Sequence, residues 1–283
     1  MGFHEKPTTF IGHVNIKVED LERSIAFYRD ILGFDVLEQT ASTVKLTTDG
    51  KNNFLSLEQP EGVTPKEVRA TGLYHFAILL PTTKDLANIT LQLVKHGVQF
   101  GASDHLVSEA LYLKDPDGNE IEIYRDRKPE EWNWQGNQVD MVTDPLDFDR
   151  LLTHATPDEP WDRMPADTVM GHIHLHVSEL VDTEEFYVKG LGMDVVNRFG
   201  TQALFLSYGK YHHHVGVNTW KGEGAPAPSK NSVGLESYTL VFDNDEVRNE
   251  TINNLKSIGA EVVEENGQFF THDPSGNRIE LAV

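Results

Sequence analysis

The sequence contains no cysteine, which excludes disulfides, thiolate nucleophiles and cysteine-ligated iron–sulfur clusters and suits a reducing compartment. It is also poor in basic residues, with 24 Lys and Arg against 45 Asp and Glu and a formal net charge of −21 at pH 7. Nucleic acids and anionic membrane surfaces attract basic surfaces. The charge therefore argues against both as partners.

Long hydrophobic runs are missing as well: none reaches the length needed to span a bilayer. The first residues, MGFHEKPTTFIGHV, have no apolar segment typical of a secretory signal. We therefore expect a cytoplasmic protein with no membrane partner. Its 283 residues suffice for two domains, and the charge leaves the oligomeric state open, a homo-oligomer included.

Two long stretches of the sequence repeat each other. Residues 12–36 (GHVNIKVEDLERSIAFYRDILGFDV) and 171–195 (GHIHLHVSELVDTEEFYVKGLGMDV) both have the pattern of a strand, an acidic helix start and a helix with a Phe-Tyr pair. A glycine then ends the helix before a second strand. In GHIHLHV the histidines alternate with apolar residues, so His172, His174 and His176 should share one face of a strand.

Two weaker copies begin at residues 72–81 (GLYHFAILLP) and 234–243 (GLESYTLVFD). Each predicts a helix next, near residues 85–96 and 245–258, and ends in a tight turn and a last strand, DPDGNEIEIY or DPSGNRIELAV. The sequence therefore predicts an α+β fold of four βαβββ units. They span residues 10–59 and 72–126 in a first domain and 170–221 and 233–283 in a second. The acidic connector, residues 127–169, should carry a helix around residues 145–154.

The stretches GHIHLHVSEL, SEALYLKDPDGNEIEIY and YHHHVGVNTW resemble the vicinal-oxygen-chelate superfamily (glyoxalases, bleomycin resistance proteins and extradiol dioxygenases). More narrowly they resemble its two-domain catechol 2,3-dioxygenases. The resemblance implies two vicinal-oxygen-chelate domains with curved mixed sheets around a metal cavity. Because this fold also hosts lyases, thiol transferases and inactive binding modules, it does not by itself fix the reaction.

The resemblance also implies where metal ligands lie: early on the first strand and early on the last strand of each unit. In the four units the first-strand positions are His13, His75, His172 and Ser237. The last-strand positions, four residues after a turn glycine, are Phe54, Glu122, His213 and Glu280. At the third of these positions, His212 or His214 could be the ligand in place of His213.

A single site needs two units that face each other, and the middle two supply the best set: His75, Glu122, His172 and His213. Every other pairing places Ser237 or Phe54 at a ligand position. The resemblance to extradiol dioxygenases further implies a tyrosine ten residues before the ligand glutamate. Tyr112 stands ten before Glu122, whereas a phenylalanine stands ten before Glu280.

We therefore predict His75, Glu122 and His172 as the metal ligands. This requires the middle two units to meet in space and leaves the outer two as a degenerate partner site. It departs from the arrangement most often described for the family, in which both C-terminal units supply the site.

Two neutral imidazoles and one carboxylate bind Fe(II), with Mn(II) as an alternative, and leave positions for a bidentate catecholate and dioxygen. In this interpretation His213 shuttles a proton, Tyr112 hydrogen-bonds the charge that develops on oxygen, and His174 contacts a substrate oxygen. The expected reaction is extradiol (meta) cleavage of catechol or a substituted catechol by dioxygen. Its product is of the 2-hydroxymuconic semialdehyde type.

Three alternatives stay open. A glyoxalase-like metal lyase or isomerase would use His213 as a fourth ligand with Ni, Zn or Co. A hydroquinone-type ring-cleaving dioxygenase is a close variant of the first interpretation. A non-enzymatic module would bind a small molecule in the same cavity, and the histidines would then be buried, hydrogen-bonded side chains.

Overall fold

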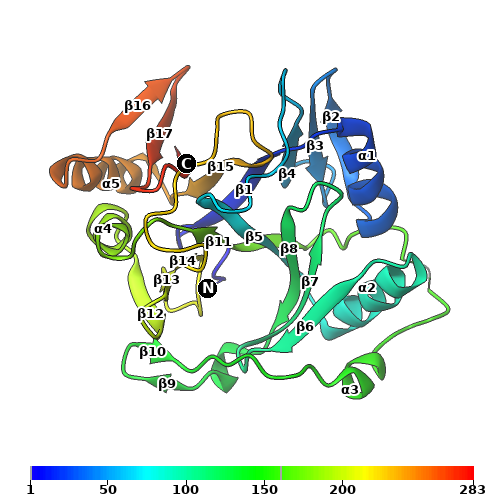
Figure 1. The fold of residues 1–283 in the computed structure, drawn as a ribbon. Helices are drawn as coiled ribbons and strands as arrows, with labels where there is room; N and C mark the ends of the chain where they lie inside the picture. Colours follow the sequence, from blue (N-terminus) through cyan, green and yellow to red (C-terminus); the bar gives the residue numbers. More distant parts are fainter. Residues whose placement is uncertain (1, 160) are drawn as a thin grey trace.

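The fold consists of two large curved sheets with helices on their outer flanks (Figure 1). The computed structural model describes residues 2–159 and 161–283. Each large sheet has eight strands, in the orders β16-β17-β18-β15-β1-β4-β3-β2 and β12-β13-β14-β11-β5-β8-β7-β6. We call the first the outer sheet and the second the middle sheet, after the units that build them. The α+β class and the curved mixed sheets predicted from the sequence are confirmed.

The first and third units both contain a short helix that continues as a π-helix. The first is built from β1 (Phe10–Lys17), α1 (Leu21–Ala26), η1 (Phe27–Leu32), β2 (Asp35–Gln39), β3 (Thr43–Thr47) and β4 (Leu55–Glu58). The third is built from β11 (Val169–His176), α4 (Val181–Glu185), η3 (Phe186–Gly190), β12 (Asp194–Phe199), β13 (Ala203–Ser207) and β14 (Val215–Asn218).

The second and fourth units contain one longer α-helix each. The second is built from β5 (Gly72–Leu79), α2 (Thr83–Lys95), β6 (Phe100–Asp104), β7 (Ser108–Lys114) and β8 (Glu120–Asp126). The fourth is built from β15 (Gly234–Val241), α5 (Asp245–Ser257), β16 (Val262–Glu265), β17 (Gln268–His272) and β18 (Arg278–Ala282). The connector holds η2 (Pro129–Glu131), β9 (Trp134–Gln135), β10 (Gln138–Val139) and α3 (Phe148–Leu152).

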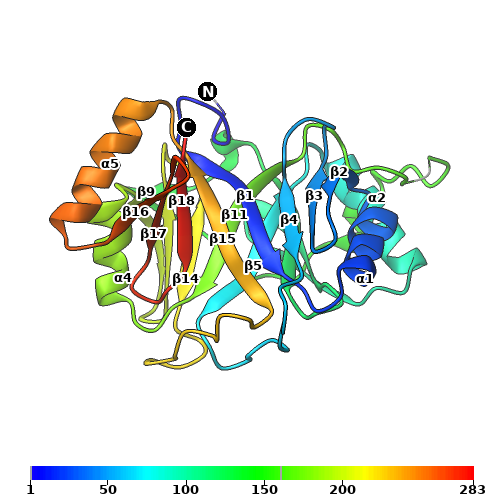
Figure 2. The ribbon, with the colours of Figure 1, turned by 90° about the horizontal axis from the view of Figure 1, so that it is seen from above.

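Each large sheet takes one unit from each half of the chain. In the middle sheet, β5 pairs antiparallel with β11 and so joins the second unit to the third. In the outer sheet, β1 pairs antiparallel with β15 and joins the first unit to the fourth. The strands of these two junctions lie next to each other at the centre of the molecule, β1 near β11 and β15 near β5 (Figure 2).

The repeated motifs tie the two sheets together. In the turn DPDGN, Asp115 accepts hydrogen bonds from the backbone of Asp117 and Asn119, and Gly118 has the positive φ of +79° that the turn requires. Tyr28 of the first unit reaches across and donates to Asp115 at 3.1 Å. Asp273 accepts the matching hydrogen bond from Tyr187 at 3.1 Å in the other half of the chain. The tyrosines of the Phe-Tyr pairs therefore anchor each helix to a turn of the other sheet.

The long helices begin where a side chain can cap them. Thr82 accepts a hydrogen bond from the backbone N–H of Asp85 at the start of α2, and Asn244 accepts from Val247 at the start of α5. Both helices pack against the hydrophobic faces of the sheets, α1 beside α2 on one flank and α4 beside α5 on the other (Figure 1). Among the described residues, no helix combines the length and apolar character that crossing a membrane requires.

Candidate metal centre

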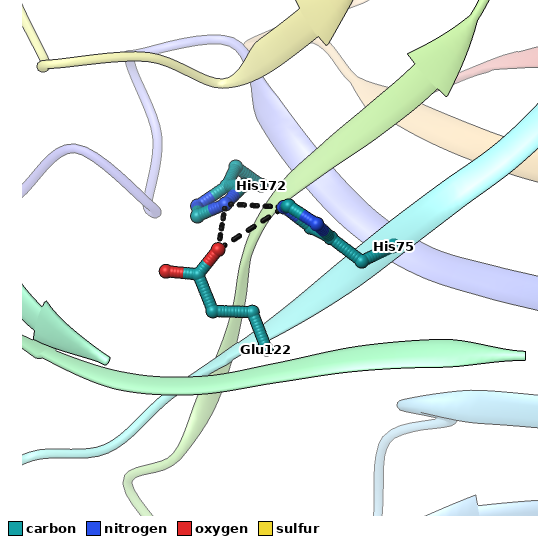
Figure 3. A group of neighbouring side chains, drawn as sticks. All are labelled: His75, Glu122 and His172. Atoms are coloured by element: carbon teal, nitrogen blue, oxygen red, sulfur yellow. Dashed lines mark hydrogen bonds and ion pairs between the residues drawn. The ribbon is translucent and has the colours of Figure 1, made fainter. Parts of the chain in front are cut away.

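Three side chains from three neighbouring strands of the middle sheet converge on one point (Figure 3). His75 extends from β5, Glu122 from β8 and His172 from β11. The Nε2 atoms of both histidines lie 3.0 Å from Oε2 of Glu122, and 3.4 Å from each other. All three side chains are buried. The pairing of β5 with β11 thus brings together the three residues that the sequence singled out as ligands.

The donor set fits a divalent transition metal. Two ligands bound at about 2.1 Å and at right angles lie about 3.0 Å apart, which is the spacing of each histidine nitrogen from the glutamate oxygen. The two Nδ1 atoms, of His75 and His172, are buried and have no hydrogen-bond partner among the described residues. Each ring can therefore carry its proton on Nδ1 and present the Nε2 lone pair to an ion.

The electrostatics of the cluster favour the ligand-competent protonation states. Burial disfavours the charge of Glu122, but His172 and His75 hold the pKa of this carboxyl well below its usual range. Burial lowers the pKa of His172 to about 4, against the opposing effect of Glu122. At neutral pH the pair is therefore an anionic carboxylate beside a neutral imidazole.

His213 lies next to this cluster, with its ring centroid 4.1 Å from that of His172. Its Nδ1 is 2.8 Å from Nδ1 of His212, whose Nε2 is 2.8 Å from a carboxylate oxygen of Asp126. When Nε2–H of His212 donates to Asp126, its Nδ1 accepts from Nδ1–H of His213. This leaves the Nε2 lone pair of His213 free as a proton acceptor. Burial lowers the pKa of His213 well below its usual value, so the ring is neutral.

Asn218, on β14, connects the other two histidines of β11. Its amide Nδ2 donates to Nε2 of His174 at 3.0 Å, and its Oδ1 accepts from Nδ1 of His176 at 2.8 Å. Gly216 lies against the ring of His174, where a Cβ atom would approach to 2.8 Å, so glycine makes room for it. His174 faces the same cavity as the metal cluster, whereas His176 faces a separate pocket.

Tyr112, on β7, is linked to the connector. Its hydroxyl lies 2.6 Å from Nε2 of His105, and Nδ1 of His105 lies 2.6 Å from the carbonyl oxygen of Val142. Because a carbonyl can only accept, Nδ1 of His105 carries a proton, and a neutral ring accepts the Tyr112 hydroxyl at Nε2. Burial, together with the negative charge of Glu122, raises the pKa of Tyr112 well above its usual value.

These groups open onto a cavity of about 330 Å³ in the middle sheet. Residues 141–143 of the connector form one wall, so the segment between the two halves closes the site. Its lining is mostly apolar and includes Tyr74, Phe205 and Trp220. Such a cavity, with polar groups in fixed positions between apolar walls, is typical of a small-molecule site.

The remaining ligand positions lie in the outer sheet and do not form a second cluster among the described residues. There Nδ1 of His13 contacts the hydroxyl of Thr239, which donates to Glu280. Phe54 is buried in the hydrophobic core, and Ser237 pairs with Asn15 of β1. Asp126 and Asn218 were not predicted from the sequence, where each stands out only by following a motif of the site, EIEIY or HHHVGV.

Comparison with known proteins places this geometry in a family. The family model described as Glyoxalase/Bleomycin resistance protein/Dioxygenase superfamily matches residues 10–123 and 169–281. Catechol-2,3-dioxygenase of Bacillus subtilis (strain 168) is 45% identical over 280 residues, covering 97% of this chain and 98% of that protein. Biphenyl-2,3-diol 1,2-dioxygenase 3 of Rhodococcus globerulus is 34% identical over 129 residues, covering 44% and 68%.

Solved structures agree on the fold. A putative dioxygenase from Bacillus subtilis superposes with a TM-score of 0.65 at 15% identity, covering 96% of this chain and 84% of that one. Glyoxalase I from Zea mays superposes with a TM-score of 0.60 at 16% identity, covering 97% and 92%. The resemblance drawn from the sequence is confirmed. The chain belongs to the glyoxalase/bleomycin resistance protein/dioxygenase superfamily and is a catechol 2,3-dioxygenase-like enzyme.

Proposed function

We propose that this protein is an Fe(II)-dependent extradiol dioxygenase that cleaves catechol or a substituted catechol beside its vicinal hydroxyl groups. The observation that carries the proposal is the size of the ligand set. Among the described residues, the cluster of converging donor atoms has three members, His75, Glu122 and His172, and His213 is outside it. Three ligands leave adjacent positions for two substrates, whereas the lyase alternative uses His213 as a fourth.

Fe(II) held by these three residues would supply the redox chemistry with dioxygen and the positions for a bidentate catecholate. The protein side chains position the ring and handle the protons. Tyr74, Phe205 and Trp220 offer aromatic surfaces for the ring, and the cavity of about 330 Å³ is of the size that small-molecule ligands occupy.

His213 is the proposed proton acceptor. Its Nε2 lone pair is set by the chain of hydrogen bonds that runs through His212 to Asp126. A neutral imidazole in this position can take a proton from a substrate hydroxyl and return it to the product. His174, held by Asn218, is proposed to contact a substrate oxygen.

Tyr112 is proposed to work together with His105. The tyrosine hydroxyl donates to Nε2 of His105, and its oxygen can accept a hydrogen bond from a substrate hydroxyl. Turned toward the substrate instead, the same hydroxyl can donate to negative charge that develops on oxygen. The short distance between the two groups, 2.6 Å, supports a hydroxyl that the histidine holds in place.

Extradiol cleavage is tested by loading the protein with Fe(II) without oxygen, then adding catechol in oxygenated buffer. An oxygen electrode and visible absorbance are read together. We expect oxygen uptake matched by a yellow semialdehyde. No uptake by protein shown to hold one Fe(II) would reject the proposal, and isomerisation of a hemithioacetal with Ni(II) would then favour the lyase. His13→Ala, which removes a histidine outside the metal cluster, is the matched control variant and should keep its oxygen uptake.

A further inference from the structure

The metal cavity opens between two aromatic side chains. In the part of the chain that the structure describes, the exposed aromatic side chains are those of Phe148, Phe199 and Trp220. Two of them, Phe199 (62% exposed) and Trp220 (43% exposed), line this cavity. His75 and Glu122 line it as well and are buried. The cavity is therefore closed at the metal ligands and open at two apolar rings.

Three paired strands bring these two rings to the same edge of the middle sheet. Phe199, the last residue of β12, pairs with Ala203 of β13, which pairs in turn with Asn218 of β14. The side chain of Asn218 accepts a hydrogen bond from the backbone N–H of Trp220 at 3.0 Å. The indole packs against His174, with ring centroids 5.5 Å apart. Both rings are thus positioned by the sheet, and each keeps apolar surface open to solvent.

No positive charge accompanies these rings. Neither lysine nor arginine is among the described residues that line the cavity, whereas Glu122 is. Arg198 lies on the face of β12 opposite to Phe199, because side chains alternate along a strand, and it pairs with Glu184. Lys221 lines a separate pocket. An ionised group at the mouth of the cavity would therefore lose water without gaining a partner of opposite charge.

The depth of the cavity determines which part of a substrate meets these rings. A diol that reaches the buried ligands with both hydroxyl groups turns the opposite edge of its ring toward the opening. A substituent on that edge, at ring carbon 4, then lies beside Phe199 and Trp220. Covering their exposed apolar surface is favourable for an alkyl or aryl group. A carboxylate gains nothing from these surfaces.

We propose that Phe199 and Trp220 determine substrate specificity: they bind an uncharged, apolar substituent on the ring and disfavour an ionised one. The inference rests on the proposed function and names its substrate class, which is catechols with alkyl or aryl substituents rather than catechols with a carboxylate side chain. Suitable probes are 3,4-dihydroxyphenylacetate and its methyl ester, which present the same ring with and without a negative charge.

Affinity is measured by titration calorimetry of the Fe(II)-loaded protein without oxygen. The wild type should bind the ester more tightly than the acid, by about tenfold or more. Phe199→Arg, which places a cation at the mouth, should lower this preference about fivefold, the effect of an exposed ion pair. Val181→Arg is the matched control, because it adds the same charge at an exposed position of α4 outside the cavity. It should keep the wild-type preference.

Phe199→Ala removes apolar surface without adding charge, and should weaken binding of the ester more than binding of unsubstituted catechol. The proposal is overturned if the wild type binds ester and acid equally, if Phe199→Arg and Val181→Arg show the same preference, or if Phe199→Ala weakens both ligands equally. Oxygen uptake with unsubstituted catechol tests the reaction separately. Preference for the ester without cleavage of catechol would reject the proposed function alone, and cleavage without preference would reject the specificity assignment alone.

Discussion

His105 and Tyr112 share a hydrogen bond of 2.6 Å that links the connector to the wall of the metal cavity. The histidine is oriented by the carbonyl of Val142, so the segment between the two halves of the chain positions a group in the site. The tyrosine hydroxyl is therefore held at a fixed point before any substrate enters, which is the condition for effective electrostatic catalysis.

Tyr112→Phe should lower turnover of catechol about 100-fold, because it removes one positioned hydroxyl and little volume. Metal content should stay at the wild-type level, since Tyr112 is not a ligand. The measurement is steady-state oxygen uptake with iron determined on the same sample.

His105→Ala should give a similar loss of turnover, and the double variant should be little worse than either single variant. Additive losses would show that the two residues act independently.

The ligand assignment predicts opposite outcomes in the two sheets. His75→Ala and Glu122→Ala should each lose bound metal and activity, because each removes one of three converging donors. His13→Ala and Glu280→Ala, the corresponding changes in the outer sheet, should keep both. Metal per chain is measured by elemental analysis after gel filtration. Loss of metal in either outer-sheet variant would mean that the wrong pair of units has been assigned.

The burial of a neutral His214 should make the free energy of unfolding depend on pH. This histidine is buried, accepts from the backbone N–H of Tyr208 and donates to the carbonyl of Phe3, and burial lowers its pKa to about 3. The unfolded chain binds this proton near pH 6.5. The stability that neutral His214 contributes is therefore complete above pH 6.5 and falls as the pH drops toward 3, by on the order of 5 kcal/mol in total.

Urea unfolding of the metal-free protein between pH 7 and pH 4 measures this effect. His214→Phe should be less stable than the wild type at pH 7, by about 1–3 kcal/mol, because two backbone groups lose their partner. Its stability should then fall less steeply with pH. Equal slopes for the two proteins would show that His214 does not contribute.

Glu109 is the centre of a buried charge cluster. Its side chain has no exposed surface and forms ion pairs with Arg125 of β8 and with two arginines of the connector, Arg127 and Arg150. Glu109→Ala should lower the free energy of unfolding by about 3–5 kcal/mol, since it leaves Arg125 without its anion, whereas Arg127 keeps Asp104. Glu38→Ala, which breaks an exposed pair with Lys45, should cost about 0–1 kcal/mol. Similar losses in the two variants would contradict this account.

Much of the fold could be predicted because its signals are local. The repeats and turn motifs indicated four units, and the helices expected near residues 85–96 and 245–258 are found at Thr83–Lys95 and Asp245–Ser257. The connector helix is shorter than expected, Phe148–Leu152 within residues 145–154. The pairing of the middle units was predicted from the ligand positions that the family resemblance implies, because only these units have ligand-type residues at every one of them.

The finer design of the site depends on contacts between distant segments, which no local pattern reveals. Which of His212, His213 and His214 faces the cavity is decided by partners: His212 bonds Asp126, and His214 bonds the carbonyl of Phe3. The wall formed by residues 141–143 likewise follows from the path of the connector across the sheet. Thr239 was unremarkable in the sequence until its register with Glu280 was known.

The central claim is that the middle units hold a metal centre that inserts dioxygen into an aromatic diol. The most direct test is a single turnover of the Fe(II)-loaded protein with catechol under ¹⁸O₂, with mass spectrometry of the ring-opened product. The account predicts a semialdehyde that carries both labelled atoms, and no labelled product from His75→Ala. A product without label, or catechol recovered intact from fully loaded protein, would contradict it.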